Sequence, residues 1–408
     1  MSAAAPTHPA APAHPAAPPR HDGDPALDEA AFADLKAELA AWVTGPGEEW
    51  AERIEATGDV PPELFAELRE RGYLSLAAPP EIGGRGIPFP RYLELMEIVS
   101  RSHASIRMLV HVVNGTWRAM APYATPRQLE EVVKPSVAGD KLVAFTLTEP
   151  TAGTGADIRT TVRREGDTYV LNGEKHLITF GVRCDYWLLA ARLEGTRGHE
   201  GTVALLVPNT GLPGAEVVDD SDTMGVRGTD HAILRFRDVP VPVAARLGDE
   251  GQGLEVALGG FLLPSRVSVA MSCVGLAERA QELAIAYADR RETFGKLLRD
   301  RQAVQFYLAE NYADIAAARA LVLQAAHAYE AGAPDAGALS SASKMVAVDM
   351  LGRVTDKALQ IHGGQGYWHR NAIERVYRDA RAQRFEEGTN EIQKLVVARA
   401  VLDGTAGF

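Results

Sequence analysis

The sequence predicts a multidomain α+β protein in which a β domain separates two helical domains. The chain has 408 residues, more than a typical single domain and enough for a large buried core. Apolar residues follow helical spacing from about residue 28, change to strand-like spacing near Lys141, and return to long helical patterns after residue 253. We therefore divide the chain into residues 1–27, 28–141, 142–247 and 248–408.

Residues 1–27 form a tail rich in Ala, Pro and His. We expect it to be disordered, because its prolines oppose a helix and it has little apolar bulk to bury. It contains a single basic residue, Arg20, and cannot form an amphipathic helix. We therefore expect no targeting function for it.

The N-terminal domain is predicted to be all helical. Its first helix carries apolar residues at helical spacing up to Trp42 and breaks at the Gly-Pro-Gly of residues 45–47. A second helix follows Pro61-Pro62 and stops at Gly72. Two more helices are expected over residues 91–121 and 126–138.

The middle domain is predicted to consist of strands separated by Gly and Asp turns. These strands are expected over residues 142–147, 169–171, 187–190, 202–207 and 233–236. Prolines at 240 and 242 mark the exit from the domain. The C-terminal domain then contains four long helical patterns, over residues 255–293, 300–331, 337–362 and 389–403, which predict a bundle.

Composition excludes several classes of function. A net charge of −12 argues against a general nucleic-acid surface. Charged residues interrupt every apolar run before about 18 residues, so we expect no membrane span. Cys184 and Cys273 have no metal-ligand spacing and are interpreted as unpaired thiols of a cytoplasmic protein, and no metal site is expected.

A carboxylate precedes the last predicted helix, in the sequence Glu386-Glu387-Gly388-Thr389. Negative charge is favourable at a helix N-terminus, and this structural interpretation suffices for an isolated Glu-Gly-Thr. However, Gly388 lets the backbone approach a ligand closely, and the free amides from Thr389 onward suit a phosphate group. A base beside a nucleotide cofactor would need this layout.

Four sequence motifs together resemble the acyl-CoA dehydrogenase family, in its medium- and short-chain form. They are TEP at 148–150 with LNGEKHLIT at 171–179, RETFGK at 291–296, QIHGGQGY at 360–367, and YRDAR at 377–381 with EGTNEIQ at 387–393. Each motif is weak alone, but their order matches the family over roughly residues 28 to 403. The resemblance implies FAD as cofactor, a four-helix bundle as the C-terminal domain, and a homodimer or homotetramer.

The resemblance also implies residue roles. Glu387 matches the catalytic base, which would take the α-proton of an acyl thioester while hydride leaves Cβ. The flavin of one subunit would contact Phe145, Leu147, Thr148, Thr154, Leu177, Thr179, Thr389 and Glu391. The flavin of a neighbouring subunit would contact Arg291, Phe294, Gln302, Gln360 and Gly364. The substrate would contact Thr154, Leu263, Arg266, Glu386 and Gly388.

Four positions depart from the family pattern. Leu177 replaces a Trp beside the flavin, Thr154 lacks the acidic residue that usually follows, and Leu263 replaces an acid three positions before Arg266. Glu386 stands where many members carry Tyr; we interpret it as a rim residue, because consecutive side chains point apart.

The leading hypothesis is therefore FAD-dependent α,β-dehydrogenation of an acyl thioester, with an electron-transfer flavoprotein or oxygen as electron acceptor. Two other classes stay open: a flavin-dependent oxygenase of the same fold, and a redox-silent scaffold. Coenzyme A is favoured as the thioester carrier. An acyl carrier protein is the alternative, and it would use arginines such as Arg299, Arg301 or Arg370 should these lie near the mouth of the site.

Overall fold

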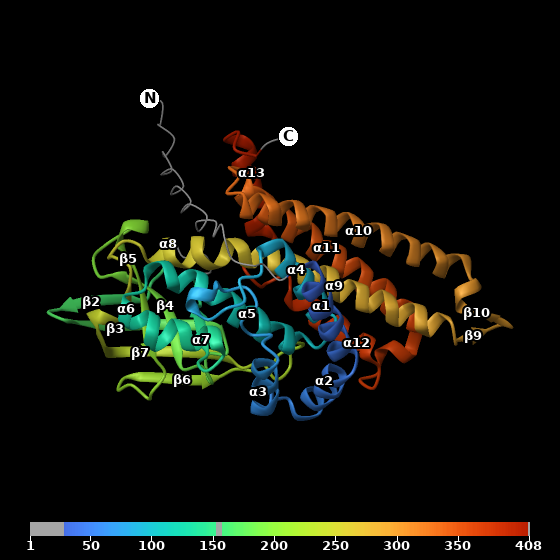
Figure 1. The fold of residues 1–408 in the computed structure, drawn as a ribbon, viewed down its shortest axis with the longest axis horizontal. Coiled ribbons are helices and arrows are strands. Elements are labelled where there is room, and N and C mark those ends of the chain that lie inside the picture. Colours follow the sequence, from blue (N-terminus) through green and yellow to red (C-terminus); the bar gives the residue numbers. More distant parts are fainter. Residues whose placement is uncertain (1–27, 152–156, 407–408) are drawn as a thin grey trace.

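A computed structural model describes residues 28–151 and 157–406. The predicted tail over residues 1–27 and the predicted site residue Thr154 lie outside these ranges. The described chain is helical at both ends and has a mixed sheet between them (Figure 1). The α+β class predicted from the periodicity is confirmed.

The N-terminal part is all helical, as predicted. Its main helices are α1 (Glu29–Thr44), α2 (Pro46–Thr57), α3 (Pro62–Glu70), α4 (Phe89–Val99) and α5 (Ala104–Met120). A further helical stretch runs through α6 (Pro126–Gln128), a π-helical turn (Leu129–Val133) and α7 (Lys134–Ala138).

Two details of the helix prediction were wrong. Gly45 ends α1 as expected, but Pro46 occupies the first turn of α2, where proline needs no hydrogen-bond donor, so a second helix follows at once. The stretch predicted as one helix over 91–121 is two helices, because residues 100–103 leave the helical conformation between α4 and α5.

The middle part is a mixed sheet with the strand order β6-β7-β3-β2-β4-β5-β8, and β1 pairs with β4. The strands are β1 (Val143–Thr146), β2 (Thr161–Glu165), β3 (Thr168–Thr179), β4 (Tyr186–Leu193), β5 (Thr202–Pro208), β6 (Ala215–Asp219), β7 (His231–Pro242) and β8 (Arg246–Leu247). The sequence did not predict β2, β6 or β8, whose alternation of apolar residues is short. It also ended β7 too early, since this strand continues through Pro240 and Pro242.

One edge of β4 is shared by two strands. β1 runs parallel to residues 186–189 of β4, and β2 pairs parallel to Arg192 and Leu193 further along the same edge. The chain between β1 and β2 therefore leaves the sheet. This gap contains the TEP sequence of residues 148–150.

The C-terminal part is helical. Its elements are α8 (Gly253–Glu255), a π-helical turn (Val256–Leu262), α9 (Leu263–Ala288), α10 (Gln302–Glu330), α11 (Ala336–His362), α12 (Ala372–Ala382) and α13 (Asn390–Leu402). Between α9 and α10, β9 (Glu292–Thr293) and β10 (Lys296–Leu297) form a hairpin. The sequence did not predict α12, which is short and rich in charge.

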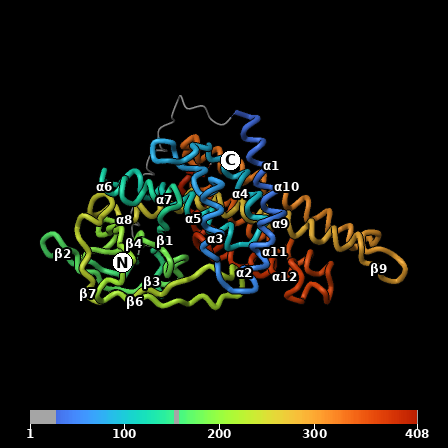
Figure 2. Tube along the Cα trace, turned by 60° about the horizontal axis from the view of Figure 1, so that its bottom comes forward, coloured from blue at the N-terminus to red at the C-terminus, as the bar shows by residue number. Residues whose placement is uncertain are grey.

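Helix α9 is the centre of the helical part and packs against α4, α10, α11 and α12. The helical stretch Gly253–Ala288 is long and apolar enough to cross a membrane, which corrects the expectation that no stretch approaches such a length. However, 72% of its most apolar window is buried inside the protein, as in the core helix of a globular bundle. Figures 1 and 2 show the β part at one end of the molecule and the β9–β10 hairpin at the other.

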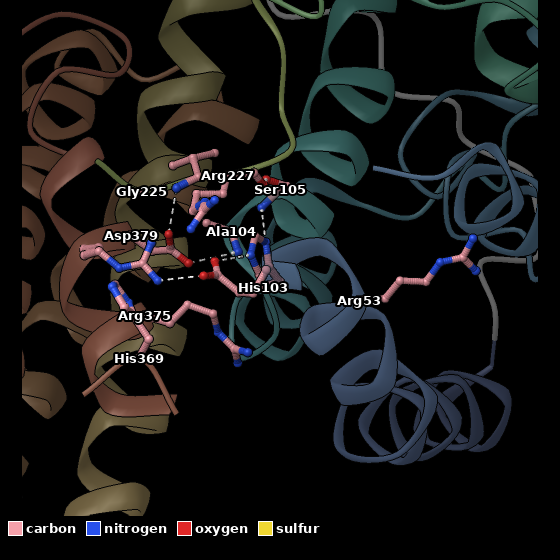
Figure 3. Close-up of polar contacts among 12 residues, drawn as sticks. Arg53, His103, Ala104, Ser105, Gly225, Arg227, His369, Arg375 and Asp379 are labelled. Atoms are coloured by element: carbon pink, nitrogen blue, oxygen red, sulfur yellow. Dashed lines mark hydrogen bonds and ion pairs between the residues drawn. The ribbon is translucent and has the colours of Figure 1, made fainter. Parts of the chain in front are cut away.

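The three parts share one apolar core and a polar junction. Carboxylate oxygens of Asp379 on α12 accept hydrogen bonds from the amides of Val226 in the β part, at 2.7 Å, and Ala104 at the start of α5, at 3.4 Å (Figure 3). Beside it, Nε2 of His103 lies 3.0 Å from Glu55 of α2. Apolar residues from all three parts belong to one continuous core. This junction fixes α12 and the loop that follows it.

Candidate active site

Glu387 lies in the short connection between α12 and α13, where the chain turns sharply. Its φ angle is 52°, and that of Gly388 is 91°. A left-handed conformation is costly for a residue with a side chain, whereas glycine adopts it without cost. The strained glutamate is therefore held in place by its surroundings.

The carboxylate of Glu387 is held by α9 and faces α5. Its Oε1 accepts a hydrogen bond from Oγ of Ser265 at 2.8 Å, and Nε2 of His111 lies 3.8 Å away. The same His111 nitrogen is 2.8 Å from Oγ of Ser265. The side chain of Glu387 is 14% exposed, so the group can meet a ligand from one side only.

Three cationic side chains from three helices hold the loop that carries Glu387. Arg107 of α5 binds the Glu386 carboxylate with both terminal nitrogens, Arg266 of α9 donates to the Glu387 carbonyl oxygen at 3.3 Å, and Lys344 of α11 donates to the Gly388 carbonyl oxygen at 2.5 Å. Carbonyl oxygens and carboxylates thus satisfy three buried or half-buried cations. The loop cannot move without breaking contacts to α5, α9 and α11.

Glu386 is therefore not a residue of an exposed rim, as its sequence position suggested. Its side chain is 15% exposed and pairs with Arg107, which is 1% exposed. Burial alone would raise the pKa of the Glu386 carboxyl, but the Arg107 guanidinium outweighs it and lowers that pKa. Consecutive side chains do point apart here, but each points into the protein.

A narrow cavity runs from the Glu387 contacts into the space between α4, α5 and α9. Its walls include His111, Gly115, Phe261 and Ser265, and also Tyr92 and Arg118. A Cβ atom added to Gly115 would lie 3.0 Å from the ring of Phe261, so only glycine fits this ring without a shift. The cavity therefore leads directly to the residues around Glu387.

Several residues predicted to contact the flavin line one face where β1 and β3 end. Leu147 is buried, whereas Phe145, Thr148 and Thr179 are half-buried. The register of β3 shifts between Lys175 and Ile178, and this bulge turns Leu177 outward at a φ of 56°, with 60% of the residue exposed. Phe145 packs against Phe261, with ring centroids 4.5 Å apart, which joins this face to the cavity.

A buried ion pair links two of the sequence motifs. Nζ of Lys175 in β3 lies 2.9 Å from Oε1 of Glu149 and donates to the Leu147 carbonyl oxygen at 3.0 Å. Glu149 also accepts from the amides of Arg159 and Thr160. Burial lowers the pKa of Lys175 to about 8, against the attraction of Glu149. The pair thus anchors the segment that leaves the sheet between β1 and β2.

The second predicted flavin cluster lies at the far end of α9. Arg291, Phe294, Gln302, Gln360 and Gly364 are all exposed there, and Phe294 is 99% exposed at the tip of the β9–β10 hairpin. Ser265 begins α9 and contacts Glu387, whereas residue 291 follows its end. A helix of 26 residues spans ~39 Å, so the two clusters cannot contact one flavin within one chain.

The other residues predicted to contact the flavin, the substrate or its carrier lie either near Glu387 or at the far end of α9. Thr389 and Glu391 lie at the start of α13, beside Gly388, and Glu391 is exposed. Leu263 is half-buried, and its carbonyl oxygen accepts from Ser340 at 2.8 Å. Arg299 pairs with Asp289, at the opposite end of α9 from Ser265, and Arg301 donates to Thr293 of the adjacent hairpin. Arg370 bonds to Gln365, in the turn after His362, whose ring stacks on Tyr287 at that same end of α9. These arginines are therefore not near the mouth of the Glu387 site.

Sequence reasoning missed four residues of the site: Arg107, His111, Ser265 and Lys344. Arg107 and Lys344 gave one usable signal, since each is a charge on the buried face of an apolar helix and must have a partner. No local pattern identified those partners, which lie 279 and 44 positions away in the sequence.

Three family models match nearly the whole described chain. They are the acyl-CoA dehydrogenase N-terminal domain over residues 31–140, its middle domain over 144–239 and its C-terminal domain over 251–402. These segments correspond to the helical, β and helical parts of the fold. The described structure thus has the family's parts in the family's order.

Known proteins resemble this chain along most of its length. An acryloyl-CoA reductase (NADH) of Anaerotignum propionicum is 36% identical over 357 residues, covering 86% of this chain and 89% of the relative. The CarC subunit of the caffeyl-CoA reductase–Etf complex of Acetobacterium woodii is 32% identical over 355 residues, covering 86% and 92%. The structure of butyryl-CoA dehydrogenase from Megasphaera elsdenii superimposes with a TM-score of 0.84 and 32% identity, covering 90% and 98%. With all three domain models matched in order and relatives aligned over most of their length, the chain belongs to the acyl-CoA dehydrogenase family.

Proposed function

We propose that this protein is an FAD-dependent oxidoreductase that introduces an α,β double bond into an acyl-CoA thioester, with Glu387 as the base that takes the α-proton. The observation that carries the proposal is the placement of the Glu387 carboxylate. It contacts Ser265 and lies 3.8 Å from His111, two residues that line a cavity between α4, α5 and α9, and three cations hold its loop. A general base must be held at a fixed position relative to the carbon atom whose proton it removes.

The residues on the face beside β1 and β3 fit a flavin ring. Leu177 exposes apolar surface there, Phe145 offers an aromatic edge, and Thr148 and Thr179 are half-buried residues with hydroxyl groups. Such groups are suited to an apolar ring system with a polar rim. A bound FAD would supply the acceptor for the hydride that leaves Cβ.

The chain's own residues would prepare the proton transfer. Ser265 orients the carboxylate by its hydrogen bond, and the left-handed backbone at Glu387 and Gly388 directs it toward the cavity. Arg266 and the Gly388 backbone lie beside the base and would hold the thioester end of the substrate. Phe145 and Phe261 would exclude water from the acyl chain.

The flavin site would be completed by a second chain. The separation of ~39 Å along α9 supports this, because the exposed Arg291 and Phe294 would otherwise have no cofactor to contact. We therefore propose a homodimer, or a homotetramer of two dimers. The relative that is a subunit of an Etf complex supports an electron-transfer flavoprotein as redox partner.

Two relatives are reductases by name, which favours a second candidate direction. In that direction the same Glu387 would return a proton to the α-carbon of a 2-enoyl thioester. Supplying the purified protein with a 2-enoyl-CoA and a reducing electron-transfer flavoprotein, and comparing the rate with that of acyl-CoA oxidation, measures which direction dominates.

The direct test is Glu387→Gln, which keeps an oxygen to accept from Ser265 but removes the base. We expect FAD to stay bound and anaerobic flavin reduction by acyl-CoA to fall by orders of magnitude. Glu63→Gln is the control, because this carboxylate on α3 is 66% exposed in its side chain and should leave the rate unchanged. Near-normal flavin reduction by Glu387→Gln would reject the proposed role.

Three further measurements distinguish the alternative functions and carriers. A purified protein without flavin absorbance would indicate a redox-silent scaffold, and a hydroxylated product formed with NADPH and oxygen would indicate an oxygenase. For the carrier, one acyl group is compared on coenzyme A and on an acyl carrier protein. Coenzyme A is favoured, because Arg299, Arg301 and Arg370 lie away from the Glu387 site.

A further inference from the structure

The imidazole of His111 is joined to the carboxylate of Glu387 through one serine. Nε2 of His111 lies 2.8 Å from Oγ of Ser265, and that oxygen lies 2.8 Å from Oε1 of Glu387. The direct distance from Nε2 to Oε1 is 3.8 Å, which is too long for a hydrogen bond. His111 and Ser265 are 3% and 4% exposed. The histidine therefore reaches the carboxylate through the serine hydroxyl.

The chemistry of the three groups fixes the direction of both hydrogen bonds. A base that is ready to take a proton is an ionised carboxylate and can only accept, so the Ser265 hydroxyl donates its single proton to Glu387. The hydroxyl oxygen then accepts from His111, and Nε2 must carry a proton for this bond. In a neutral imidazole the other nitrogen, Nδ1, is then unprotonated. His111 is therefore the first donor of a chain that ends on the base.

The direction of the Ser265 hydroxyl differs from that of two other serines on α9. A serine in a helix often donates to the carbonyl oxygen four positions earlier. Ser268 and Ser272 both do so, at 3.3 and 2.9 Å. Ser265 instead donates out of its helix to Glu387. The bond from His111 explains the difference, because it occupies one side of the Ser265 oxygen and leaves the hydroxyl proton on the side of the carboxylate.

The second nitrogen of His111 does not explain why an imidazole lies here. Nδ1 is buried and has no hydrogen-bond partner among the described residues. A buried polar atom without a partner lowers stability. The ring also packs near Phe261, with centroids 6.2 Å apart, but an apolar side chain of similar size would fill the same space. The contact that requires an imidazole is therefore the one to Ser265.

We propose that His111 is a positioning residue for the base. Its Nε2–H holds the Ser265 hydroxyl on Oε1 of Glu387, and this leaves Oε2 to take the α-proton of the thioester. The inference rests on the proposed function, since it needs Glu387 to be the base. In the proton transfer the Cα–H bond breaks, an O–H bond forms at Oε2, and the electron pair of the broken bond stays with the substrate.

The contacts of the carboxylate agree with this division between its two oxygens. The hydrogen bond from Ser265 and the approach of His111 both involve Oε1 of Glu387. When Oε2 becomes protonated, Oε1 is the carbonyl oxygen of a carboxylic acid and still accepts from Ser265. Both hydrogen bonds of the chain are thus kept before and after the transfer. No polar side chain of this chain has to reorient during the reaction, which is the benefit of a preorganised site.

The test replaces His111 by side chains that differ in where they hold a donor. In His111→Gln the amide N–H takes the place of Nε2–H, whereas in His111→Asn the side chain is one methylene group shorter and its amide lies near the position of Nδ1. His111→Leu has similar bulk and no donor. We expect His111→Gln to stay within about threefold of the unaltered rate and the other two variants to fall by about 10-fold, because small displacements of a catalytic group are costly.

Two measurements on FAD-loaded protein separate base positioning from substrate binding. The first is the exchange of the α-hydrogens of (methylthio)acetyl-CoA in D2O. Sulfur replaces Cβ in this probe, so no hydride can leave and only the action of the base is measured. The second is anaerobic flavin reduction over a range of acyl-CoA concentrations, which gives the rate and the dissociation constant separately. We expect both rates to fall in His111→Asn and His111→Leu with little change in the dissociation constant.

A double-mutant cycle tests whether His111 acts through Ser265. His111→Leu should slow the exchange in the unaltered protein but cause no further loss in Ser265→Ala, because the connecting hydroxyl is already absent. Ser272→Ala is the matched control on α9, since its hydroxyl bonds to the Ser268 carbonyl, and His111→Leu should have its full effect in that background. Thermal unfolding of His111→Leu should occur at the same or a higher temperature, because the unpaired Nδ1 is removed.

The outcomes distinguish this role from the proposed function. Equal exchange rates in His111→Leu and the unaltered protein reject the role of His111 and leave the assignment of Glu387 intact. Equal losses in His111→Gln and His111→Asn, or a loss in His111→Leu that adds to that of Ser265→Ala, also reject it. If His111→Leu does not fold, the comparison of the Gln and Asn variants still decides. If the unaltered protein neither exchanges the probe nor is reduced by acyl-CoA, the proposed function fails and this inference fails with it.

Discussion

The guanidinium of Arg107 and the carboxylate of Glu386 form a bidentate ion pair, with Nη1–Oε2 and Nη2–Oε1 distances of 2.9 and 2.8 Å. The pair joins α5 to the loop that carries the neighbouring Glu387, although 279 positions separate its members. It is therefore a structural support directly beside the proposed base.

Removing one member of this pair should destabilise the protein. In Arg107→Met, the Glu386 carboxylate stays buried without its partner, and we expect a loss of about 3–5 kcal/mol. Thermal unfolding of the FAD-loaded protein measures it. The double variant Arg107→Met with Glu386→Met should recover most of this loss, because no uncompensated charge remains. A double variant as unstable as the single one would show that the pair is not the cause.

Ser265 should position Glu387 rather than take part in the chemistry. In Ser265→Ala the carboxylate loses its hydrogen bond, and bonds to charged groups contribute about 1.5–3 kcal/mol. We therefore expect the rate of anaerobic flavin reduction to fall by at least 10-fold with little change in substrate affinity. Ser272→Ala is the control on the same helix, because within the described residues its hydroxyl bonds only to the Ser268 carbonyl and it does not line the cavity. A large rise in KM at unchanged kcat would instead assign Ser265 to substrate binding.

Glu55 should make stability depend on acid pH. Burial alone would raise its pKa, but hydrogen bonds from His103 and Arg378 outweigh it and lower that pKa from 4.5 to about 2. A carboxyl group with a lowered pKa in the folded state contributes stability above pH 4.5, and this contribution is lost as the pH falls toward 2.

Unfolding measured between pH 5 and about 2 should therefore show a steep loss of stability that is weaker in Glu55→Gln. Glu63→Gln is the control, since the Glu63 side chain is 66% exposed. If the free energy of unfolding falls equally steeply with pH in Glu55→Gln and in the unaltered protein, this role of Glu55 is rejected.

The hairpin tip tests the proposed second flavin contact. Phe294 is 99% exposed and should be covered by a partner chain and its cofactor. Phe294→Asp places a charge in that contact, so we expect a lower ratio of flavin to protein absorbance and a smaller oligomer by light scattering. Met224→Asp is the control, since Met224 is 58% exposed in the β part. Full flavin content and unchanged mass in Phe294→Asp would place the cofactor in a single chain.

Local patterns in the sequence were enough to predict the order of the helical and β domains. The change from helical to strand-like spacing predicted the α, β, α order, because burial of one face imposes a period on each element. Local patterns could not predict β2, β6 and β8, which are short. They also could not predict α2, whose first turn contains the proline that appeared to end a helix.

The family resemblance, also read from the sequence alone, singled out Glu387 as the base, since its EGTNEIQ sequence is a local pattern. What that base touches was decided by tertiary structure. The burial of Glu386 against Arg107 and the contacts of Ser265 with His111 and Glu387 join segments far apart in the chain. Periodicity reports which face of an element is buried but not which residue lies opposite. Only the packing of α5, α9 and α11 around one loop brought these charges together.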